Sequence, residues 1–423
     1  MKATTSKKWR TYLAFWLFGI CNNITYSMML GAAEDIISRS GGGGGKKDDG
    51  NSTCPSKSES RKCDGHQSTG IVLLVDILPS LVIQLIAPML IADRLSFTVR
   101  MLMVVSFQAV SLFIVAMAGN FGLSILGVAM TSMSSGLGES TLVSLSSHFP
   151  KPTVVAWASG TGVAGILGSF LYAALTEPHL VNLKPETVLL MSLVIPILYA
   201  ITFWLILDYP TNLLRIFRSR KIKTMDIVEG EKSNSQEKLT VQEQRKTTIK
   251  EKFLLIKPLL HYMIPLTLVY VGEYVINQGF TQFLLFDCRH GFNLSKESQY
   301  RWYQVLYSVG VFISRSSSPI ANLPRIIVYI LPVLQLANAI FFYFEALHAY
   351  LPHISIAFAL IFYEGLLGGS SYVKTINDVH KMAAPDVREF SLAVVMTSDS
   401  TGILIASLLA ILLHNQICDQ LGT

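Results

Sequence analysis

Long apolar runs separated by short polar breaks dominate the pattern of hydrophobic and polar positions along this chain. A membrane-spanning helix needs about 20 consecutive, mostly apolar residues. The pattern therefore predicts an all-α polytopic membrane protein with about eleven transmembrane helices. Runs of this length fall at residues 11–37, 69–92, 98–118, 121–147, 153–176, 186–207, 254–287, 299–318, 323–346, 352–380 and 389–414.

Two longer polar stretches interrupt the apolar runs. Residues 39–68 follow the first predicted helix, and residues 211–252 separate the first six helices from the last five. Both stretches are too polar to bury a core. The predicted parts are an N-terminal segment at 1–10, a helix bundle at 11–210 that includes loop 39–68, a flexible loop at 211–252, a second bundle at 253–414 and a tail at 415–423.

The two bundles share a weak internal repeat. Ser135–Glu139 in the fourth predicted helix resembles Glu364–Gly369 in the tenth. Gly160–Gly165 in the fifth resembles Ser400–Leu404 in the eleventh. Parallel six-helix repeats are typical of major-facilitator transporters. The repeat predicts a major-facilitator-like fold in two pseudo-repeated halves of six and five helices, so the final helix is missing.

Charged residues predict the orientation. Only 15% of the residues are charged, against about 25% in soluble domains, and the net charge is +6. The basic residues gather in loops on one side of the predicted helices, so this side and the N-terminus are predicted to be cytosolic. The net charge is therefore no sign of nucleic-acid binding. Glycosylation sequons at Asn51 and Asn293 fall on the opposite side. Cys54 and Cys63 share loop 39–68, so a disulfide and two free thiols are both compatible with the sequence.

Ionisable residues inside the apolar runs are the candidates for function. Glu273 lies in the middle of the seventh run, where a charge costs about 2.5–3.5 kcal/mol and usually faces a cavity. We predict a central site in which a cation binds an anionic substrate group. The predicted substrate-binding residues are Arg301, Tyr300, Tyr303, Gln304, Asn277, Gln278, Glu273, Glu364 and Asp399. The candidates for proton coupling or gating are Asp76, Glu139, Arg315 and Lys374.

Some of these residues also have a simpler interpretation. Arg301 lies near the non-cytosolic end of its run and equally fits a headgroup anchor. Arg315 lies near the cytosolic end and fits a topology charge or a gate. Lys374 and Asp378 are four positions apart and fit a neutralising pair.

Motifs of enzymes and metal sites are missing from the sequence. It contains no nucleophile elbow, P-loop, HExxH or kinase motif. No set of Cys and His residues has the spacing of a zinc site. We therefore predict a protein that is not an enzyme and that uses no metal or cofactor.

Several sequence blocks are spread along most of the chain. They are Phe15–Asn23, Ala32–Asp35, Asp76–Ile83, Ser134–Glu139, Ser159–Gly162, Glu273–Gly279, Tyr300–Gln304, Ser314–Ser317, Tyr363–Gly369, Arg388–Phe390 and Ser398–Asp399. These blocks resemble the battenin family, lysosomal membrane proteins associated with Batten disease. The resemblance implies a major-facilitator-like glycoprotein of late-endosomal and lysosomal membranes. It also implies a role in clearing glycerophosphodiesters from the lysosome, with effects on lysosomal pH and autophagy.

These features together predict a lysosomal transporter that exports small anionic phosphodiesters by alternating access. One alternative is a membrane scaffold whose trafficking partners bind residues 211–252. Another is a proton-coupled carrier of basic amino acids. The sequence alone leaves the coupling ion, the direction of transport and the oligomeric state open.

Overall fold

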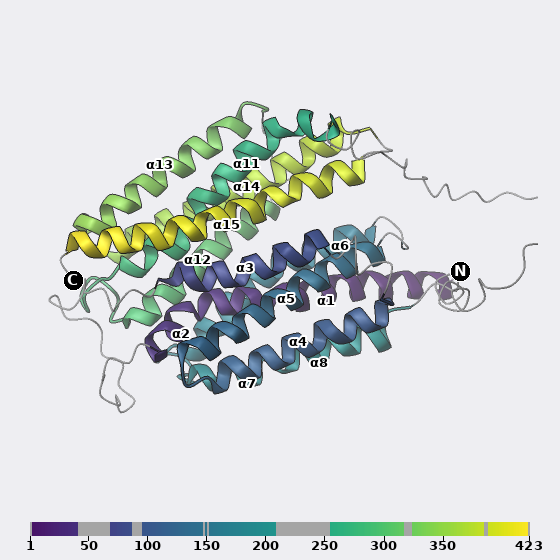
Figure 1. Cartoon of the computed structure of the whole chain (residues 1–423), viewed down its shortest axis with the longest axis horizontal. Helices are drawn as coiled ribbons and strands as arrows, with labels where there is room; N and C mark the ends of the chain where they lie inside the picture. The colour runs from purple at the N-terminus through teal and green to yellow at the C-terminus, as the bar shows by residue number, and fades with distance from the viewer. Residues whose placement is uncertain are drawn as a thin grey trace, which may run out of the picture.

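The computed structural model describes residues 2–40, 68–86, 95–146, 149, 152–208, 254–316, 324–384 and 388–421. Their regular elements are helices that run between the two ends of an elongated bundle (Figure 1). The first helix begins at one end and the last helix finishes at the other. We call the end that holds Asp35 and the last turns of the final helix the Asp35 end.

The N-terminal half contains the helices before the long central loop. Its sixth predicted helix consists of α7, α8 and a π-helical turn, interrupted at Ser192 and Leu193. The elements are α1 (Lys2–Gly31), α2 (Ala33–Ser40), α3 (Thr69–Ile86), α4 (Phe97–Met117), α5 (Phe121–Ser146), α6 (Pro152–Thr176), α7 (Pro185–Met191), α8 (Val194–Ile201) and the π-helical turn η2 (Thr202–Ile206).

The C-terminal half begins with a helix that changes geometry along its length. The α-helix α11 passes into a π-helical turn, an irregularity that is common at functional sites. The elements are the 3₁₀ turn η3 (Lys257–Leu259), α11 (Leu260–Val275), the π-helical turn η4 (Ile276–Phe280), the 3₁₀ turn η5 (Thr281–Phe283), α12 (Lys296–Ser316), α13 (Ile327–His348), α14 (Ile354–Met382) and α15 (Arg388–Leu421).

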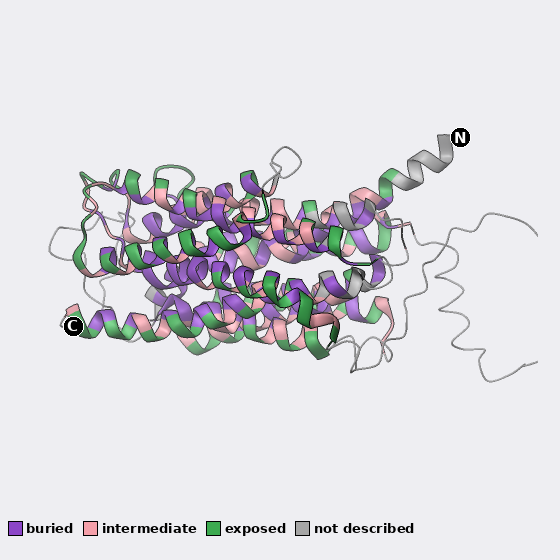
Figure 2. Cartoon of the chain, turned by 90° about the horizontal axis from the view of Figure 1, so that it is seen from above, coloured by how far each residue is buried: buried purple, intermediate pink, exposed green. Residues whose placement is uncertain are grey.

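Ten helical segments of the described residues are long and apolar enough to cross a membrane. The eighth predicted helix corresponds to α12, which has 21 residues but a low mean hydropathy. Its polar residues, including Lys296, Arg301 and Arg315, explain the difference. Side chains on the outer faces are largely exposed (Figure 2) and often apolar, as at Leu205, where the exposed fraction is 69%. Such a surface fits lipid better than water.

The same helix pairs pack in both halves, which accounts for the internal repeat. The first and fifth helices pair as α1 with α6 and as α11 with α15. The second and fourth pair as α3 with α5 and as α12 with α14. Glycines lie at these crossings in both halves: a Cβ at Gly160 would meet the Trp16 carbonyl of α1, and one at Gly402 would lie 2.7 Å from the Thr267 carbonyl of α11. Small residues at these positions let the helices approach closely.

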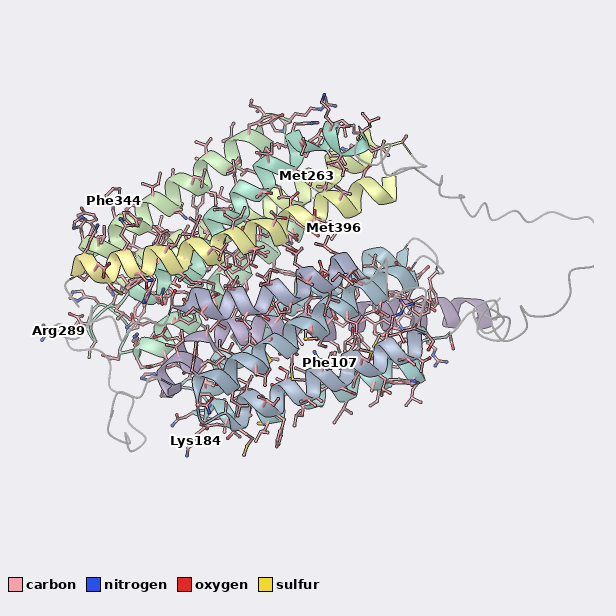
Figure 3. All side chains as sticks on the ribbon, in the orientation of Figure 1. Phe107, Lys184, Met263, Arg289, Phe344 and Met396 are labelled. Carbon is pink, nitrogen blue, oxygen red and sulfur yellow. The ribbon has the colours of Figure 1, made fainter. Side chains whose placement is uncertain are left out.

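The two halves meet through α3 with α15 and through α6 with α12. Figure 1 shows the two groups of helices stacked along their lengths, and Figure 3 shows their side chains filling the space between neighbouring helices. The two halves therefore contact each other mainly through these two helix pairs. Any conformational change that moves one half against the other must act on this interface.

Three cysteines lie in the described part of the chain. Cys288 and Cys418 are disulfide-bonded, and Cys21 is a buried free thiol. Cys288 follows η5 and Cys418 lies in the last turn of α15, so both bonds lie at the Asp35 end. Disulfides persist in oxidising compartments. Cys54 and Cys63, whose pairing the sequence leaves open, fall outside the described residues, as does Asn51.

Candidate functional site

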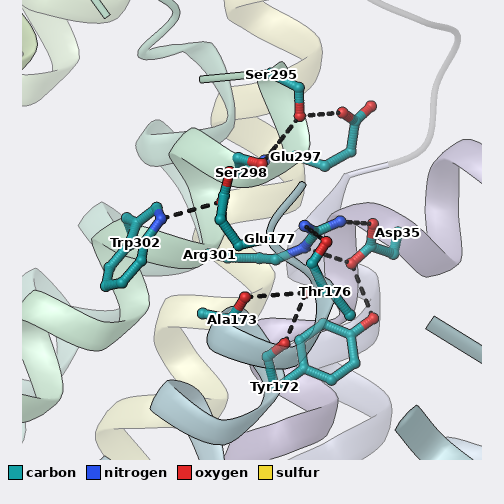
Figure 4. Close-up of polar contacts among 10 residues, drawn as sticks. All are labelled: Asp35, Tyr172, Ala173, Thr176, Glu177, Ser295, Glu297, Ser298, Arg301 and Trp302. Carbon is teal, nitrogen blue, oxygen red and sulfur yellow. Dashed lines mark hydrogen bonds and ion pairs between the residues drawn. The ribbon is translucent and has the colours of Figure 1, made fainter. Parts of the chain in front are cut away.

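A buried ion pair joins the two halves at the Asp35 end. Arg301 of α12 binds Asp35 of α2 through both carboxylate oxygens, with Nε–Oδ2 at 3.0 Å and Nη2–Oδ1 at 2.7 Å (Figure 4). The Tyr172 hydroxyl of α6 also donates to Asp35 Oδ2, at 2.9 Å. Both charged side chains are only 8% exposed. Bidentate, charge-assisted bonds of this kind are strong and geometrically specific. We call Asp35, Tyr172 and Arg301 the Asp35 latch.

Further polar contacts between the halves surround this latch. Lys296 Nζ of α12 lies 3.0 Å from Glu34 Oε1 of α2. The Trp302 indole donates to Glu177 Oε2, beyond the end of α6, at 3.2 Å. Burial raises the pKa of the Glu34 carboxyl, and the neighbouring Lys296 ammonium partly offsets this effect. Residues of α2, of α6 and just beyond the end of α6 thus all contact α12.

A second polar layer joins α3 and α12 to the π-helical turn η4. The Thr69 hydroxyl of α3 donates to the Gln278 carbonyl at 2.5 Å, and the Thr69 amide donates to Gln282 Oε1 at 3.3 Å. The Tyr300 hydroxyl donates to Gln278 Oε1 at 2.7 Å. Because Thr69 belongs to one half and Gln278 to the other, these bonds also hold the Asp35 end closed.

Two buried glutamates lie where α11 meets α14. Glu273 accepts a hydrogen bond from the Tyr307 hydroxyl, and Glu364 Oε1 accepts one from Asn277 Nδ2 at 2.8 Å. Glu273 is 2% exposed and Glu364 is fully buried. Gly368 lies one turn after Glu364, and a Cβ there would overlap the Glu273 carboxylate. The glycine therefore makes room for a carboxylate between the two helices.

Arg315 lies among tyrosines nearer the other end of α12. Its Nη2 donates to the Tyr270 hydroxyl at 3.2 Å, and its guanidinium stands 4.3 Å from the centre of the Tyr372 ring. The Tyr270 and Tyr274 rings stack at 6.1 Å, and Tyr274 packs edge-on against Tyr307 at 6.5 Å. We call Tyr26, Tyr270, Tyr274, Tyr307 and Tyr372 the central tyrosine cluster.

The central tyrosine cluster faces the interface between the halves. Tyr26 of α1 packs against the hydrophobic cluster that contains Tyr270 and Tyr274 of α11. The α3 helix, which carries Asp76, packs against α15, which carries Asp399. Residues from α1 and α3 of the first half thus approach α11 and α15 of the second.

The predicted polar residues of the N-terminal half differ in their hydrogen bonding. Glu139 Oε2 accepts a hydrogen bond from Gln84 Nε2 at 2.8 Å. Both carboxylate oxygens of Asp76 are buried and have no hydrogen-bond partner among the described residues. Asp76 is therefore the most completely desolvated carboxyl on this side of the interface.

The remaining predicted residues of the C-terminal half have local partners. Asp399 accepts from the Ser400 amide at 2.5 Å. Lys374 Nζ bonds both oxygens of Asp378 at 2.7 Å, which is the geometry of a neutralising pair. The Tyr303 hydroxyl donates to the Leu284 carbonyl at 2.9 Å, and Gln304 donates to the Asn277 carbonyl at 3.2 Å. Asn293, the described sequon residue, is exposed in the loop before α12.

The predicted residues fall in two regions, one around Arg301 at the Asp35 end and one around Arg315 nearer the other end of α12. Asn277, Gln278 and Gln304 lie between the latch and the two glutamates. Arg301 and Arg315 stand fourteen positions apart on α12, which is about 21 Å along a helix. A small substrate cannot contact both arginines in this conformation.

Several polar residues at these sites carry no signal of their own in the sequence. Asp35 and Lys296 lie at the ends of apolar runs, where charges are ordinary. The tyrosines are more informative, because Tyr270 and Tyr274, and likewise Tyr303 and Tyr307, are spaced four apart and so share a helix face.

An apolar groove of about 380 Å³ lies between α11, α13 and α15. It exposes no polar surface to a hydrophilic ligand. We therefore place the candidate site in the polar regions described above. The groove is lined by Val271, Gly272, Val275, Phe280, Leu336, Ala339, Ile340, Tyr343, Leu409 and Leu413.

Comparison with known families accounts for the arrangement of the chain. Residues 13–420 match the family model of the CLN3 protein. The chain belongs to the CLN3 protein family. One member, battenin of Canis lupus familiaris, is 36% identical over 97% of this chain and 92% of its own length.

Solved structures show that this CLN3-family chain has a transporter fold. A D-xylose–proton symporter matches it with a TM-score of 0.64 at 10% identity, over 96% of this chain and 90% of the symporter. A bacterial homologue of the human lysosomal transporter Spinster, in an inward-facing, unoccupied conformation, matches with a TM-score of 0.54 at 13% identity, over 94% of this chain and 80% of that protein. The chain is therefore a multi-pass membrane protein with a major-facilitator-like fold.

Proposed function

We propose that this chain is a transporter of lysosomal and late-endosomal membranes that exports small anionic phosphodiesters, in particular glycerophosphodiesters, by alternating access. The observation that carries the proposal is the polar closure of one end of the interface between the halves. The Asp35 latch and the Thr69–Gln278 bonds join the halves there. Alternating access requires such links, because they form in one state and break in the other.

The orientation of the bundle follows from its charges and its exposed sequon. The basic loops fall on the side of the N-terminus, which is cytosolic by the positive-inside rule. Asn293 is exposed at the opposite, Asp35 end, where a luminal sequon has to lie. In the proposed orientation, the Asp35 end is luminal and the described state is closed toward the lumen.

The choice of substrate rests on the chemistry of the interface and on the family resemblance. A glycerophosphodiester carries one negative charge and several hydroxyl groups, so it needs a cation and many hydrogen-bonding side chains. The interface supplies Arg315, the tyrosine hydroxyls, and the amides of Asn277 and Gln278. None of these functions requires a bound metal, a cofactor or a covalent step. Effects on lysosomal pH and autophagy would follow from the loss of this export.

Uptake by proteoliposomes tests the proposal directly. Purified protein should accumulate glycerophosphocholine, and liposomes without protein should not.

Cross-linking tests alternating access. Thr69→Cys and Gln282→Cys would be combined, because the Thr69 amide lies 3.3 Å from Gln282 Oε1. A short bifunctional thiol reagent should then block uptake in the double variant and not in either single variant. Failure of the wild type to take up any glycerophosphodiester would exclude the substrate. Full uptake after confirmed cross-linking would exclude alternating access through this interface.

The two alternative functions make different predictions. A trafficking scaffold would lose activity when residues 211–252 are deleted and keep it when interface residues are changed. A carrier of basic amino acids would take up lysine or arginine in the same liposomes. The central position of Arg315 disfavours this carrier, because a cationic substrate would be repelled there.

A further inference from the structure

We infer that Arg315 binds the anionic group of the substrate and that the central tyrosine cluster binds its hydroxyl groups. The inference rests on the proposed transport function and adds to it the residue that recognises the anion. It differs from the assignment that the sequence favours, in which Arg301 is the substrate-binding arginine and Arg315 a gate or topology charge.

The ion pairs of α12 distinguish its two arginines. Arg301 is bound on two nitrogens by Asp35, so its charge is already compensated. No carboxylate of the described residues lies within ion-pair distance of Arg315. Among the described residues, its one hydrogen bond goes to the neutral Tyr270 hydroxyl, and its Nε atom is buried without a partner. A partly buried cation without an ion pair is costly, and an anion bound there would remove that cost.

Two lysines of the C-terminal half are already in ion pairs. Lys374 is held by Asp378 and Lys296 by Glu34. Both pairs neutralise their charge locally, so neither lysine attracts an anion as strongly as an unpaired arginine would. Among these residues of the C-terminal half, Arg315 alone combines a central position with an uncompensated charge.

The surroundings of Arg315 suit a phosphodiester. The guanidinium stacks on Tyr372, which holds its plane and leaves its edge free to bind a phosphate through two parallel hydrogen bonds. The hydroxyls of Tyr270 and Tyr274 stand close by, on stacked rings. Tyrosine hydroxyls both donate and accept hydrogen bonds, so they bind a glycerol hydroxyl that acts either as an acceptor or as a donor.

The position of Arg315 also fits transport. Ser308 lies seven positions before Arg315 and so on the same face of α12, and its hydroxyl stands 3.2 Å from that of Ser169 in α6 of the other half. A substrate bound at Arg315 therefore lies at the seam between the halves. It lies beyond the closed Asp35 end, about fourteen helix positions from the latch arginine. This is where an alternating-access transporter holds its substrate.

Binding of radiolabelled glycerophosphocholine to purified protein tests the inference. Arg315→Gln should weaken binding roughly 10- to 100-fold, the range for losing hydrogen bonds to a charged group. Arg315→Lys keeps the charge but not the planar fork, so it should bind with an intermediate affinity. Glycerol 3-phosphate should compete for the wild-type site, whereas choline should not. Arg289→Gln is the matched control, because Arg289 is exposed in the loop at the Asp35 end (Figure 3).

The outcomes separate this inference from the proposed function. If the wild type transports glycerophosphocholine and Arg315→Gln binds it with unchanged affinity, the anion site is assigned wrongly and transport still stands. If choline competes and glycerol 3-phosphate does not, the site recognises a cation and the inference is overturned. If the wild type neither binds nor transports the compound, the proposed substrate fails first. Should Arg315→Gln not fold, judged by its elution as a monodisperse peak, Arg315→Lys compared with Arg289→Lys gives the same decision.

Discussion

Breaking the Asp35 latch should open the Asp35 end of this protein. In Asp35→Asn, the Arg301 guanidinium keeps its burial at 8% exposure but loses its carboxylate. Removing one partner of a buried ion pair costs about 3–5 kcal/mol because the other charge is left uncompensated. Exposed pairs are worth only about 0–1 kcal/mol. If the latch forms only in the closed state, a loss of about 3 kcal/mol shifts the balance between closed and open states at least roughly 100-fold.

A cysteine reporter measures this shift. Thr281 in η5 is 1% exposed, and its hydroxyl bonds only within its own segment, to the Asn277 carbonyl at 2.6 Å. Thr281→Cys should therefore leave the latch intact and react slowly with a membrane-impermeant maleimide. Adding Asp35→Asn should raise the labelling rate above that of Thr281→Cys alone. Asp35→Asn without the reporter gives the background labelling. Adding Arg289→Gln instead should not.

The double variant Asp35→Asn with Arg301→Gln tests whether these two residues act as a pair. It leaves no buried charge unpaired, so labelling should fall back toward the rate of the reporter alone. The reasoning is refuted if Asp35→Asn changes the labelling rate by less than about threefold. It is also refuted if the double variant opens further than Asp35→Asn, because the two residues would then act independently.

Two further predictions follow from packing and titration. Gly368→Ala should lower the free energy of unfolding by about 1–3 kcal/mol and reduce uptake, because its Cβ would overlap the Glu273 carboxylate. Gly162→Ala is the control in thermal unfolding, because a Cβ there would meet nothing within 4 Å. Equal stability of the two variants would contradict the packing. Because burial raises the pKa of Glu34, its carboxyl contributes stability below its ordinary pKa of about 4.3 and loses that contribution as the pH rises through the raised value. Glu34→Gln should therefore show a smaller fall in melting temperature than the wild type between pH 4 and pH 7. Identical curves for Glu34→Gln and the wild type would show that Glu34 does not titrate in this range.

The sequence was sufficient for the class and architecture of this protein. Spans of about 20 apolar residues have one stable solution in lipid, a helix whose backbone bonds are all internal. The repeat between residues 135–139 and 364–369 also held, because both segments supply the fourth helix of a half and pack on the second. Close helix crossings need small residues, so glycines leave a pattern that can be read without coordinates.

Depth along a helix could be predicted, whereas partners across the interface could not. The sequence placed Glu273, Asn277 and Glu364 inside the membrane, and the structure brings Asn277 and Glu364 to 2.8 Å. Nothing in the spacing shows that Asp35, 266 residues before Arg301, neutralises it. Ion pairing between distant segments depends on how helices rotate and pack, and hydropathy carries no information on that rotation.

The sequence by itself determined that this chain forms a bundle of membrane helices in two related halves, because burying the backbone in lipid leaves few other solutions. It also determined which polar residues the membrane would have to accommodate. Only the tertiary structure decided which of the two arginines on α12 is compensated. Arg301 meets a carboxylate from the other half, while Arg315 meets neutral tyrosines. Arg301 therefore joins the two halves through an ion pair, whereas Arg315 has no carboxylate partner among the described residues. The electrostatic role of each arginine is set by the nearest charge in space and not by its position along the chain.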